Sequence, residues 1–224
     1  MEVYKIIGII FGCLGTISSI CFYLTPAVPF YKILKNNLNY QGFPWILLLI
    51  SFMNCILWTD YGLVYDFTLL YLANAIGANI TLSFLIIYLI LMTGFNCSLS
   101  LTISIGLSIC IVFITCLFYF VICEDAVKII AIIFSFLMYA LFGFKIPQVI
   151  KTKNDKLILY FYIIGGIASS ICWIIYGIYG ICEKKWELYV SNGIDLIIVI
   201  IYLIYYLKSN CKQFDLPEKL EQFE

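Results

Sequence analysis

Two asparagines are the first residues whose type and spacing suggest the binding of a small polar molecule. Asn74 and Asn192 each lie within a long apolar stretch of the sequence. A side-chain amide supplies two hydrogen-bond donors and two acceptors, which suits a polyhydroxylated molecule. Burying an amide without a partner costs roughly 1–3 kcal/mol, so each asparagine needs something to bond. The alternative to a bound molecule is a neighbouring helix, to which each amide could hydrogen-bond.

Two tryptophans share a second pattern. Trp58 and Trp173 each stand three residues before a Tyr-Gly pair. An indole ring can pack on an apolar C–H face of a small molecule while its N–H donates to a hydroxyl. The alternative is the aromatic belt at a membrane surface, where Trp is enriched. Trp45 and Trp186 lie at or near expected loops and fit the belt better.

The composition places these residues in an integral membrane protein. The chain has 224 residues, of which 64% are hydrophobic and 12% charged, whereas soluble domains typically have about 25% charged residues. Its thirteen basic residues are all Lys, they balance thirteen acids, and there is no His. This excludes a strongly basic nucleic-acid binder and a His-based triad or metal site. The ten Cys form no Cys-x-x-Cys pair. Because the sequence has no His, Cys-pair or carboxylate-pair constellation, no enzyme activity, metal or cofactor is expected.

Seven apolar stretches are long enough to cross a bilayer, whose core of about 30 Å needs about 20 apolar residues. Lipid offers no partners to backbone groups, so each stretch is expected to be a helix. The stretches are residues 6–30, 43–64, 67–92, 99–122, 127–148, 157–182 and 188–207. The predicted fold is therefore an all-α integral membrane protein with seven transmembrane helices.

The distribution of Lys predicts the orientation of these helices. With the N-terminus extracellular or luminal and the C-terminus cytosolic, nine Lys fall on inner segments and four on outer segments. This asymmetry follows the positive-inside rule. The sequence does not choose between the plasma membrane and an endomembrane. It also leaves open whether copies of the chain assemble into a homo-oligomer.

The first three helices recur as the last three. Pro26 and Pro147, each followed by a short basic turn, are 121 residues apart, the two Trp are 115 apart, and the two Asn are 118 apart. The fourth helix has no counterpart. This predicts two parallel three-helix repeats joined by a linker helix (3+1+3), with a site near mid-membrane where the repeats face each other. The expected divisions are 1–92 for the first repeat, 93–126 for the linker helix, 127–208 for the second repeat and 209–224 for a short cytosolic tail.

With these motifs the chain resembles the SWEET, or MtN3/saliva, family of sugar transporters, within the wider PQ-loop-like group. The resemblance covers residues 5–208 and rests on Pro26, Pro44, Asn54-Cys55, Trp58, Tyr61-Gly62, Asn74, Gly77, Pro147, Thr152-Lys153, Trp173, Tyr176-Gly177 and Asn192-Gly193. It implies a 3+1+3 bundle and passive, bidirectional transport of mono- or disaccharides. It also implies sugar contacts for Asn74, Asn192, Trp58 and Trp173. Because two Trp leave less room than one, we expect a monosaccharide such as glucose.

The prolines and two tyrosines are expected to move or close the bundle. Proline removes a helix hydrogen bond, which makes Pro26, Pro44 and Pro147 candidate hinges. The resemblance implies a fourth proline in the sixth helix, where this chain has Leu159, so fourfold hinge symmetry is in doubt. Tyr61 and Tyr176 are candidate gate residues near the outer mouth.

Asp195 is the least expected residue of the predicted seventh helix. It follows Asn192 by three residues and so lies on the same helix face. A carboxylate at mid-membrane costs at least ~2.5 kcal/mol, which by default suggests a function. Three readings stay open: it bonds sugar hydroxyls, it binds a proton and couples transport to pH, or it stays protonated and joins helices.

Two other functions compete with an uncoupled sugar carrier. Pro147-Gln148 matches the PQ signature of proton-coupled carriers for other small solutes such as amino acids, and Asp195 would suit such a mechanism. A seven-helix receptor is disfavoured by the repeat, because a receptor does not need two matching halves around one site.

The sequence also leaves open whether Cys123 and Cys182, which both lie near outer loops, form a disulfide.

Overall fold

The structure of the chain is a computed structural model that describes residues 2–36, 45–93, 106, 128–138, 140, 156–180 and 186–214. No strand occurs in these residues. Their helices are α1 (Glu2–Tyr23), α2 (Ala27–Asn36), α3 (Trp45–Val64), α4 (Thr68–Thr93), α7 (Lys156–Ile175), the π-helical turn η1 (Tyr176–Gly180) and α8 (Trp186–Phe214). A further helical segment covers Lys128–Met138 and is called the 128–138 helix. The predicted all-α fold is thus confirmed for these ranges.

Four of the described helices are long and apolar enough to cross a membrane, namely those containing Val3–Tyr23, Leu47–Val64, Thr68–Tyr88 and Trp186–Lys208. This agrees with the predicted multi-pass membrane protein. The predicted helix over 99–122 falls outside the described residues apart from Gly106, so the count of seven stays a prediction. The 3+1+3 divisions also stay a prediction.

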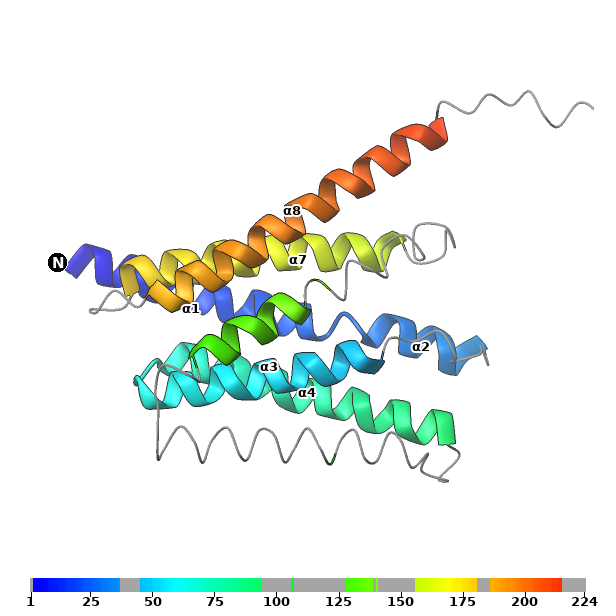
Figure 1. Cartoon of the computed structure of the whole chain (residues 1–224), viewed down its shortest axis with the longest axis horizontal. Coiled ribbons are helices and arrows are strands. Elements are labelled where there is room, and N and C mark those ends of the chain that lie inside the picture. The colour runs from blue at the N-terminus through cyan, green and yellow to red at the C-terminus, as the bar shows by residue number, and fades with distance from the viewer. Residues whose placement is uncertain are drawn as a thin grey trace, which may run out of the picture.

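The described helices form an elongated bundle with α1 at its centre (Figure 1). α3 packs along α4, α7 packs along α8, and α1 contacts both α4 and α7. The 128–138 helix lies between the α3–α4 pair and the α7–α8 pair in this view (Figure 1). We call residues 2–93 the first half and residues 128–214 the second half. α1 therefore brings the first half into direct contact with the second.

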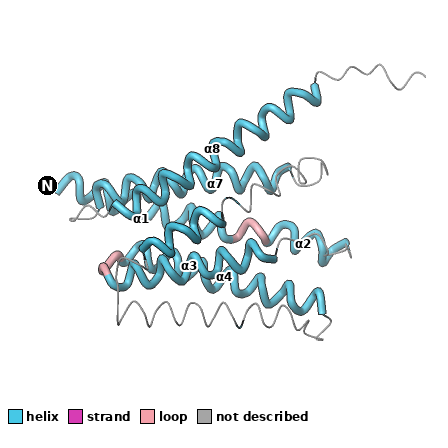
Figure 2. Tube along the Cα trace, viewed as in Figure 1, coloured by secondary structure: helices cyan, strands magenta, loops and turns pink. Residues whose placement is uncertain are grey.

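The first predicted stretch, 6–30, is two helices rather than one. α1 ends at Tyr23, a turn follows over Leu24–Pro26, and α2 begins at Ala27 (Figure 2). The Ala27 N–H donates to the Leu24 carbonyl at 2.9 Å, whereas Pro26 has no N–H to continue the helix. The basic turn expected after residue 30 is wrong, because residues 31–35 lie within α2. The break itself falls at the predicted proline.

A tight turn joins α3 to α4. Asp66 has a φ of 56°, a left-handed conformation that Asp and Asn tolerate better than most residues. The Phe67 N–H donates to the Gly62 carbonyl at 2.7 Å and the Asp66 N–H to the Leu63 carbonyl at 3.4 Å, which is the Schellman pattern of a helix C-terminus. A Cβ at Gly62 would meet the Tyr71 backbone nitrogen at 2.7 Å. Glycine at this position therefore allows the end of α3 to lie close against the start of α4.

The last helix is longer than expected. α8 runs from Trp186 to Phe214, whereas the sequence predicts a span over 188–207 and a tail from 209. Residues 209–214 are thus helical, because their backbone continues the apolar helix without a Gly or Pro to stop it. The sixth predicted stretch, 157–182, ends in the π-helical turn η1 over Tyr176–Gly180, a feature that hydropathy does not signal.

Three apolar clusters form the core. The tryptophan cluster joins both halves and consists of Leu57, Trp58, Tyr61, Phe67, Leu70, Ala73, Ala131, Trp173, Tyr176 and Leu188. The central cluster also joins both halves and consists of Phe22, Tyr23, Cys55, Met138, Ile163 and Val199. A third cluster lies within the first half and consists of Phe30, Leu48, Phe52, Leu85 and Tyr88.

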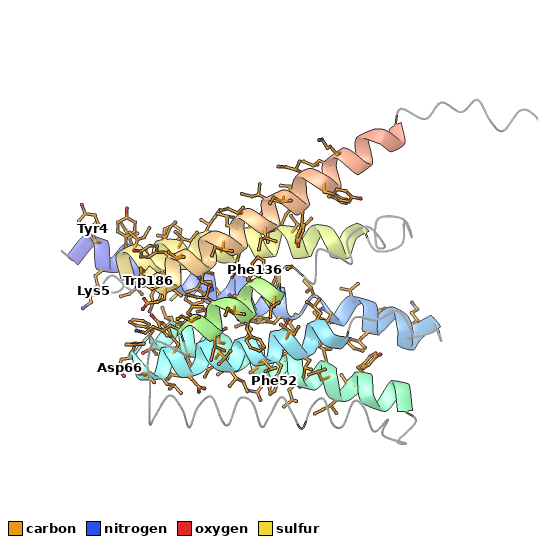
Figure 3. The ribbon with its side chains drawn as sticks, in the orientation of Figure 1. Tyr4, Lys5, Phe52, Asp66, Phe136 and Trp186 are labelled. Carbon is orange, nitrogen blue, oxygen red and sulfur yellow. The ribbon has the colours of Figure 1, made fainter. Side chains whose placement is uncertain are left out.

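The outer faces of the helices remain apolar as well. Large apolar side chains such as Ile17 on α1 and Ile197 on α8 are more than half exposed, and side chains project outward along both helices (Figure 3). In a membrane these faces contact lipid, which imposes no penalty on them. Trp186 at the start of α8 is 52% exposed, in keeping with its predicted place in the aromatic belt.

Candidate functional site

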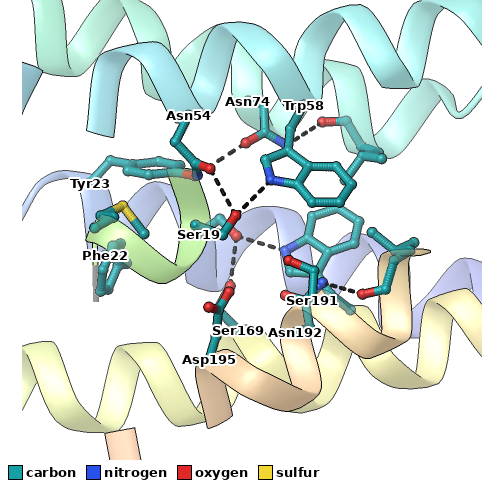
Figure 4. A pocket seen from close by; sticks show the side chains of 15 residues that line it. Ser19, Phe22, Tyr23, Asn54, Trp58, Asn74, Ser169, Ser191, Asn192 and Asp195 are labelled. Carbon is teal, nitrogen blue, oxygen red and sulfur yellow. Dashed lines mark hydrogen bonds between the residues drawn. The ribbon is translucent and has the colours of Figure 1, made fainter. Parts of the chain in front are cut away.

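The predicted binding residues line a single cavity between the two halves. Asn74, Asn192, Trp58, Trp173 and Asp195 all face it (Figure 4). The other lining residues are Ser19, Phe22, Tyr23, Asn54, Leu70, Ser135, Met138, Ser169, Leu188 and Ser191. These side chains come from α1, α3, α4, the 128–138 helix, α7 and α8. The cavity therefore lies where the tryptophan cluster meets the central cluster.

The two asparagines adopt matching conformations. Asn74 Nδ2 donates to the Leu70 carbonyl at 2.9 Å, and Asn192 Nδ2 donates to the Leu188 carbonyl at 2.7 Å. Each bond reaches four residues back along the same helix and orients the amide. Because each amide nitrogen carries two hydrogens, one N–H of each asparagine remains for another acceptor.

The amide oxygens of the pair differ in their partners. Asn74 Oδ1 accepts a hydrogen bond from the Tyr23 hydroxyl at 3.2 Å, which links α4 to α1. In the described part of the chain, Asn192 Oδ1 accepts no hydrogen bond, and its side chain is only partly buried. Asn74 therefore joins two helices while facing the cavity. Asn192 offers both a donor and an acceptor to whatever enters.

Both tryptophans donate their indole N–H to a serine of the other half. Trp58 Nε1 lies 2.9 Å from Ser135 Oγ on the 128–138 helix, and Trp173 Nε1 lies 2.8 Å from Ser19 Oγ on α1. Both Trp are buried, at 5% and 4% exposure, which distinguishes them from belt residues. In this structure their N–H groups are engaged by protein, and only the ring faces and edges are available to a bound molecule.

The serines extend these bonds into two short networks. The Ser135 hydroxyl donates to Asn54 Oδ1 at 2.8 Å, and Ser19 Oγ lies 2.8 Å from Ser169 Oγ (Figure 4). Sequence reasoning did not assign any of these four residues to the site. Asn54 entered only through the family resemblance. Single serines in apolar helices are common and usually bond their own backbone, so no spacing pattern marks the ones that face a cavity.

Asp195 also lies in this cavity. Its side chain points from α8 into the pocket (Figure 4) and is 5% exposed. Its Oδ1 is buried and has no hydrogen-bond partner in the described part of the chain. Asn192 lines the same cavity, as the predicted shared helix face requires.

The candidate gate tyrosines lie against the tryptophans rather than in the cavity wall. The ring centres of Trp58 and Tyr61 are 5.3 Å apart with an interplanar angle of 75°, and those of Trp173 and Tyr176 are 5.5 Å apart with an angle of 80°. Edge-to-face packing of this kind is favourable beyond area burial. Both tyrosines belong to the tryptophan cluster, which packs at the end of the bundle where the α3–α4 turn lies.

An ion pair with a buried carboxylate accompanies this cluster. Lys128 Nζ lies 3.4 Å from Glu187 Oε1 and 5.3 Å from the centre of the Tyr65 ring. The pair joins the 128–138 helix to α8, and Tyr65 adds a contact to the first half. The remaining candidate positions, Pro44 and Pro147 as hinges and Cys123 with Cys182 as a pair, lie outside the described residues.

Comparison with known proteins places this arrangement among transporters. Residues 9–94 and 125–213 match the family model described as "Sugar efflux transporter for intercellular exchange". Bidirectional sugar transporter SWEET5 of Arabidopsis thaliana is 26% identical over 222 residues, covering 92% of this chain and 89% of that relative. SWEET8 of Arabidopsis thaliana is 25% identical over 239 residues, covering 97% and 95%.

A solved structure matches the fold. The structure of a eukaryotic SWEET transporter superposes on this chain with a TM-score of 0.76 at 20% sequence identity, covering 93% of this chain and 99% of that one. At this identity the likeness concerns the fold. It extends over nearly the whole length of both chains, which agrees with the expected all-α membrane architecture.

Proposed function

Because the chain belongs to the family of sugar efflux transporters for intercellular exchange, we propose that it carries a sugar across a membrane in either direction, down the sugar's own gradient. Members of this family are transporters rather than enzymes, as the sequence predicted. The observation that carries the proposal is the matched pair of asparagines in one cavity between the halves. The relatives, which are named bidirectional sugar transporters, support the same function.

The cavity residues suit the two kinds of surface that a pyranose presents. The free N–H groups of Asn74 and Asn192 and the Oδ1 of Asn192 can bond ring hydroxyls. The faces of Trp58 and Trp173 can pack against ring C–H groups. No metal or cofactor takes part in this mechanism.

A monosaccharide such as glucose is the size of sugar that we propose. The cavity has a volume of about 40 Å³, which holds about three waters at roughly 10–15 Å³ each. Even a hexose therefore requires the halves to separate. The two indole rings limit how far the cavity extends without a larger rearrangement, which disfavours a disaccharide.

Alternating access by rocking of the two halves around the cavity would provide this separation. With the N-terminus extracellular or luminal, the tryptophan cluster lies at the outer end, and Tyr61 and Tyr176 close the path on that side. Opening at the other end requires motion near the α1–α2 break, where Pro26 leaves the helix hydrogen-bond ladder interrupted. Pro26 is the hinge that the described residues support.

A proton-coupled carrier is the second candidate, and Asp195 is the observation that favours it. A buried carboxyl whose Oδ1 has no partner among the described residues can take up and release a proton as the cavity changes access. Counterflow of labelled glucose in liposomes separates the two mechanisms. Counterflow that survives collapse of the pH gradient indicates an uncoupled carrier, whereas its abolition would favour the proton-coupled carrier.

Substitution of Asn192 tests the sugar site. We expect Asn192→Ala to lower glucose uptake by purified protein in liposomes at least about tenfold, equivalent to ~1.4 kcal/mol. Asn79→Ala is the matched control, because Asn79 donates to the Ala75 carbonyl at 2.8 Å in the same way but is exposed on the outer face of α4. Near-normal uptake by folded Asn192→Ala protein would sink the assignment.

A further inference from the structure

The cavity contains one acid and no basic side chain among the described residues. Its lining has no Lys, and the sequence has no Arg or His. Besides Asp195, the titratable side chain that lines it is Tyr23, whose hydroxyl donates to Asn74 Oδ1. The described residues that line the cavity around Asp195 therefore supply amides, hydroxyls, indoles and apolar groups, but no positive charge.

One oxygen of this acid bonds no neighbouring helix in the described part of the chain. Asp195 Oδ1 is buried without a hydrogen-bond partner in the described ranges, although the side chain is only 5% exposed. Neighbouring polar groups in the same wall do have partners: Ser19 bonds Ser169 at 2.8 Å, and Asn192 bonds the Leu188 carbonyl at 2.7 Å. A buried carboxyl oxygen that has no partner in the described residues, beside the open Oδ1 of Asn192, points to a partner that enters from the cavity.

An ionised carboxylate in such a place needs an opposite charge. An unpaired buried charge is strongly unfavourable, and pairing combined with additional hydrogen bonds offsets that cost. A neutral sugar supplies only hydroxyls, so it leaves the charge uncompensated. A sugar with one protonated amine supplies both a positive charge and three N–H donors, and the loaded cavity then has no net charge.

We propose that Asp195 determines specificity by pairing with the ammonium group of an amino sugar, a hexose in which an amine replaces one hydroxyl. The inference rests on the proposed sugar transport and names a substrate class for the same cavity. The remaining N–H groups of the ammonium have an acceptor close by, because Asn192 Oδ1 lies on the same helix face and accepts no other hydrogen bond in the described residues. The ring hydroxyls use the amide N–H groups, as for a neutral hexose.

The shape of the site agrees with this class. An amine in place of a hydroxyl changes the volume of a hexose very little, so the limit set by Trp58 and Trp173 applies equally to both sugars. Discrimination between them then depends on charge alone. Asp195 is the one group in the described cavity wall that can provide it.

Uptake of two labelled sugars by the full chain in liposomes tests this. Glucosamine and glucose are compared for the wild type, Asp195→Asn and the control Asp66→Asn, which makes the same chemical change in the exposed α3–α4 turn, where Asn also tolerates the φ of 56°. We expect Asp195→Asn to lower the ratio of glucosamine to glucose uptake at least about tenfold. Asp66→Asn leaves the ratio unchanged. If Asp195→Asn leaves the ratio of glucosamine to glucose uptake unaltered, the proposal is overturned. The same conclusion applies if the only change in that variant is the loss of its response to a pH gradient.

A measurement on the wild type alone covers the case in which Asp195→Asn does not fold. Unlabelled glucosamine should inhibit glucose uptake more strongly than 2-deoxyglucose, which lacks the amine; equal or weaker inhibition overturns the proposal. Wild-type protein that transports glucose but not glucosamine refutes the amino-sugar inference and leaves sugar transport intact. Wild-type protein that transports neither sugar refutes the proposed function itself.

Discussion

The indole N–H of Trp173 donates to the hydroxyl oxygen of Ser19 at 2.8 Å, from α7 in the second half to α1 in the first. The bond from Trp58 to Ser135 has the same form and runs from the first half to the second. The two serines are 116 residues apart and the two tryptophans 115. Each half thus supplies one donor and one acceptor. The two hydrogen bonds join the walls of the cavity, and each requires a residue from both halves.

Removing one serine should destabilise the protein through the tryptophan that it leaves behind. Ser19→Ala deprives the buried Trp173 N–H of its acceptor, and an unsatisfied buried donor costs about 1–3 kcal/mol. We expect a lower unfolding temperature in detergent. Ser83→Ala is the control, since the Ser83 hydroxyl bonds its own helix at the Asn79 carbonyl and is exposed. The double variant Ser19→Ala/Trp173→Phe should lose less stability than the summed losses of the two single variants. If the two losses simply add, the Trp173–Ser19 hydrogen bond does not contribute to stability.

A methyl group at Gly77 should disturb the proposed site without replacing any residue that lines the cavity. A Cβ there overlaps the ring of Tyr23 and lies 3.0 Å from Cys55 Sγ. Tyr23 holds Asn74 Oδ1, so Gly77→Ala should displace both side chains and lower glucose uptake several-fold. Gly193→Ala provides the comparison, because nothing lies within 4 Å of a Cβ at that position. Equal uptake by the two variants would show that the Tyr23–Asn74 bond does not position the site.

Replacing one tryptophan of the cavity wall by alanine should allow the protein to transport larger sugars. Trp58→Ala removes one indole wall while Ser135 keeps its bond to Asn54, and we expect measurable uptake of sucrose in addition to glucose. Glucose uptake by the same preparation reports that the protein is folded. Trp186→Ala, at an exposed position outside the cavity, should gain no sucrose uptake. Retained glucose uptake with no gain for sucrose would mean that the indoles do not set the size limit.

The Lys128–Glu187 pair should matter for stability more than for sugar binding. The Glu187 side chain is 5% exposed, so Lys128→Met leaves a buried carboxylate without its cation, a change that typically costs about 3–5 kcal/mol. A second substitution, Glu187→Gln, removes that charge and should restore much of the loss. Unfolding temperatures of the single and double variants in detergent provide the measurement. A double variant less stable than Lys128→Met would argue against the ion pair.

Local sequence properties account for most of the helix boundaries. The stretches predicted at 43–64 and 67–92 agree with α3 at 45–64 and α4 at 68–93, because apolar length is a property of consecutive residues. The predicted boundaries differ from the structure where a helix end depends on the local backbone conformation. The basic segment 31–35 that follows the α1–α2 break is part of the helix α2 rather than a turn, and α8 extends to Phe214.

The same distinction applies to the proposed binding residues. The repeated pattern singled out Asn74, Asn192, Trp58 and Trp173, because matching places in two apolar repeats can be recognised in the sequence. Asp195 stood out separately, as an acid within an apolar stretch. The partners of these residues were not visible. Ser19 meets Trp173 across 154 residues, and Ser135 meets Asn54 across 81, and such contacts depend on which helix faces pack together.

The sequence by itself determined that this is an apolar helical membrane protein with paired amides and indoles, because residue type and spacing along one helix decide those features. Only the tertiary structure decided that the five residues share one cavity, that the indole N–H groups are already bonded, and that Asp195 faces the cavity with an oxygen unpartnered in the described residues. The physical reason is that a hydrogen bond requires two groups within about 3 Å of each other. That proximity is set by the packing of helices that lie far apart in the chain.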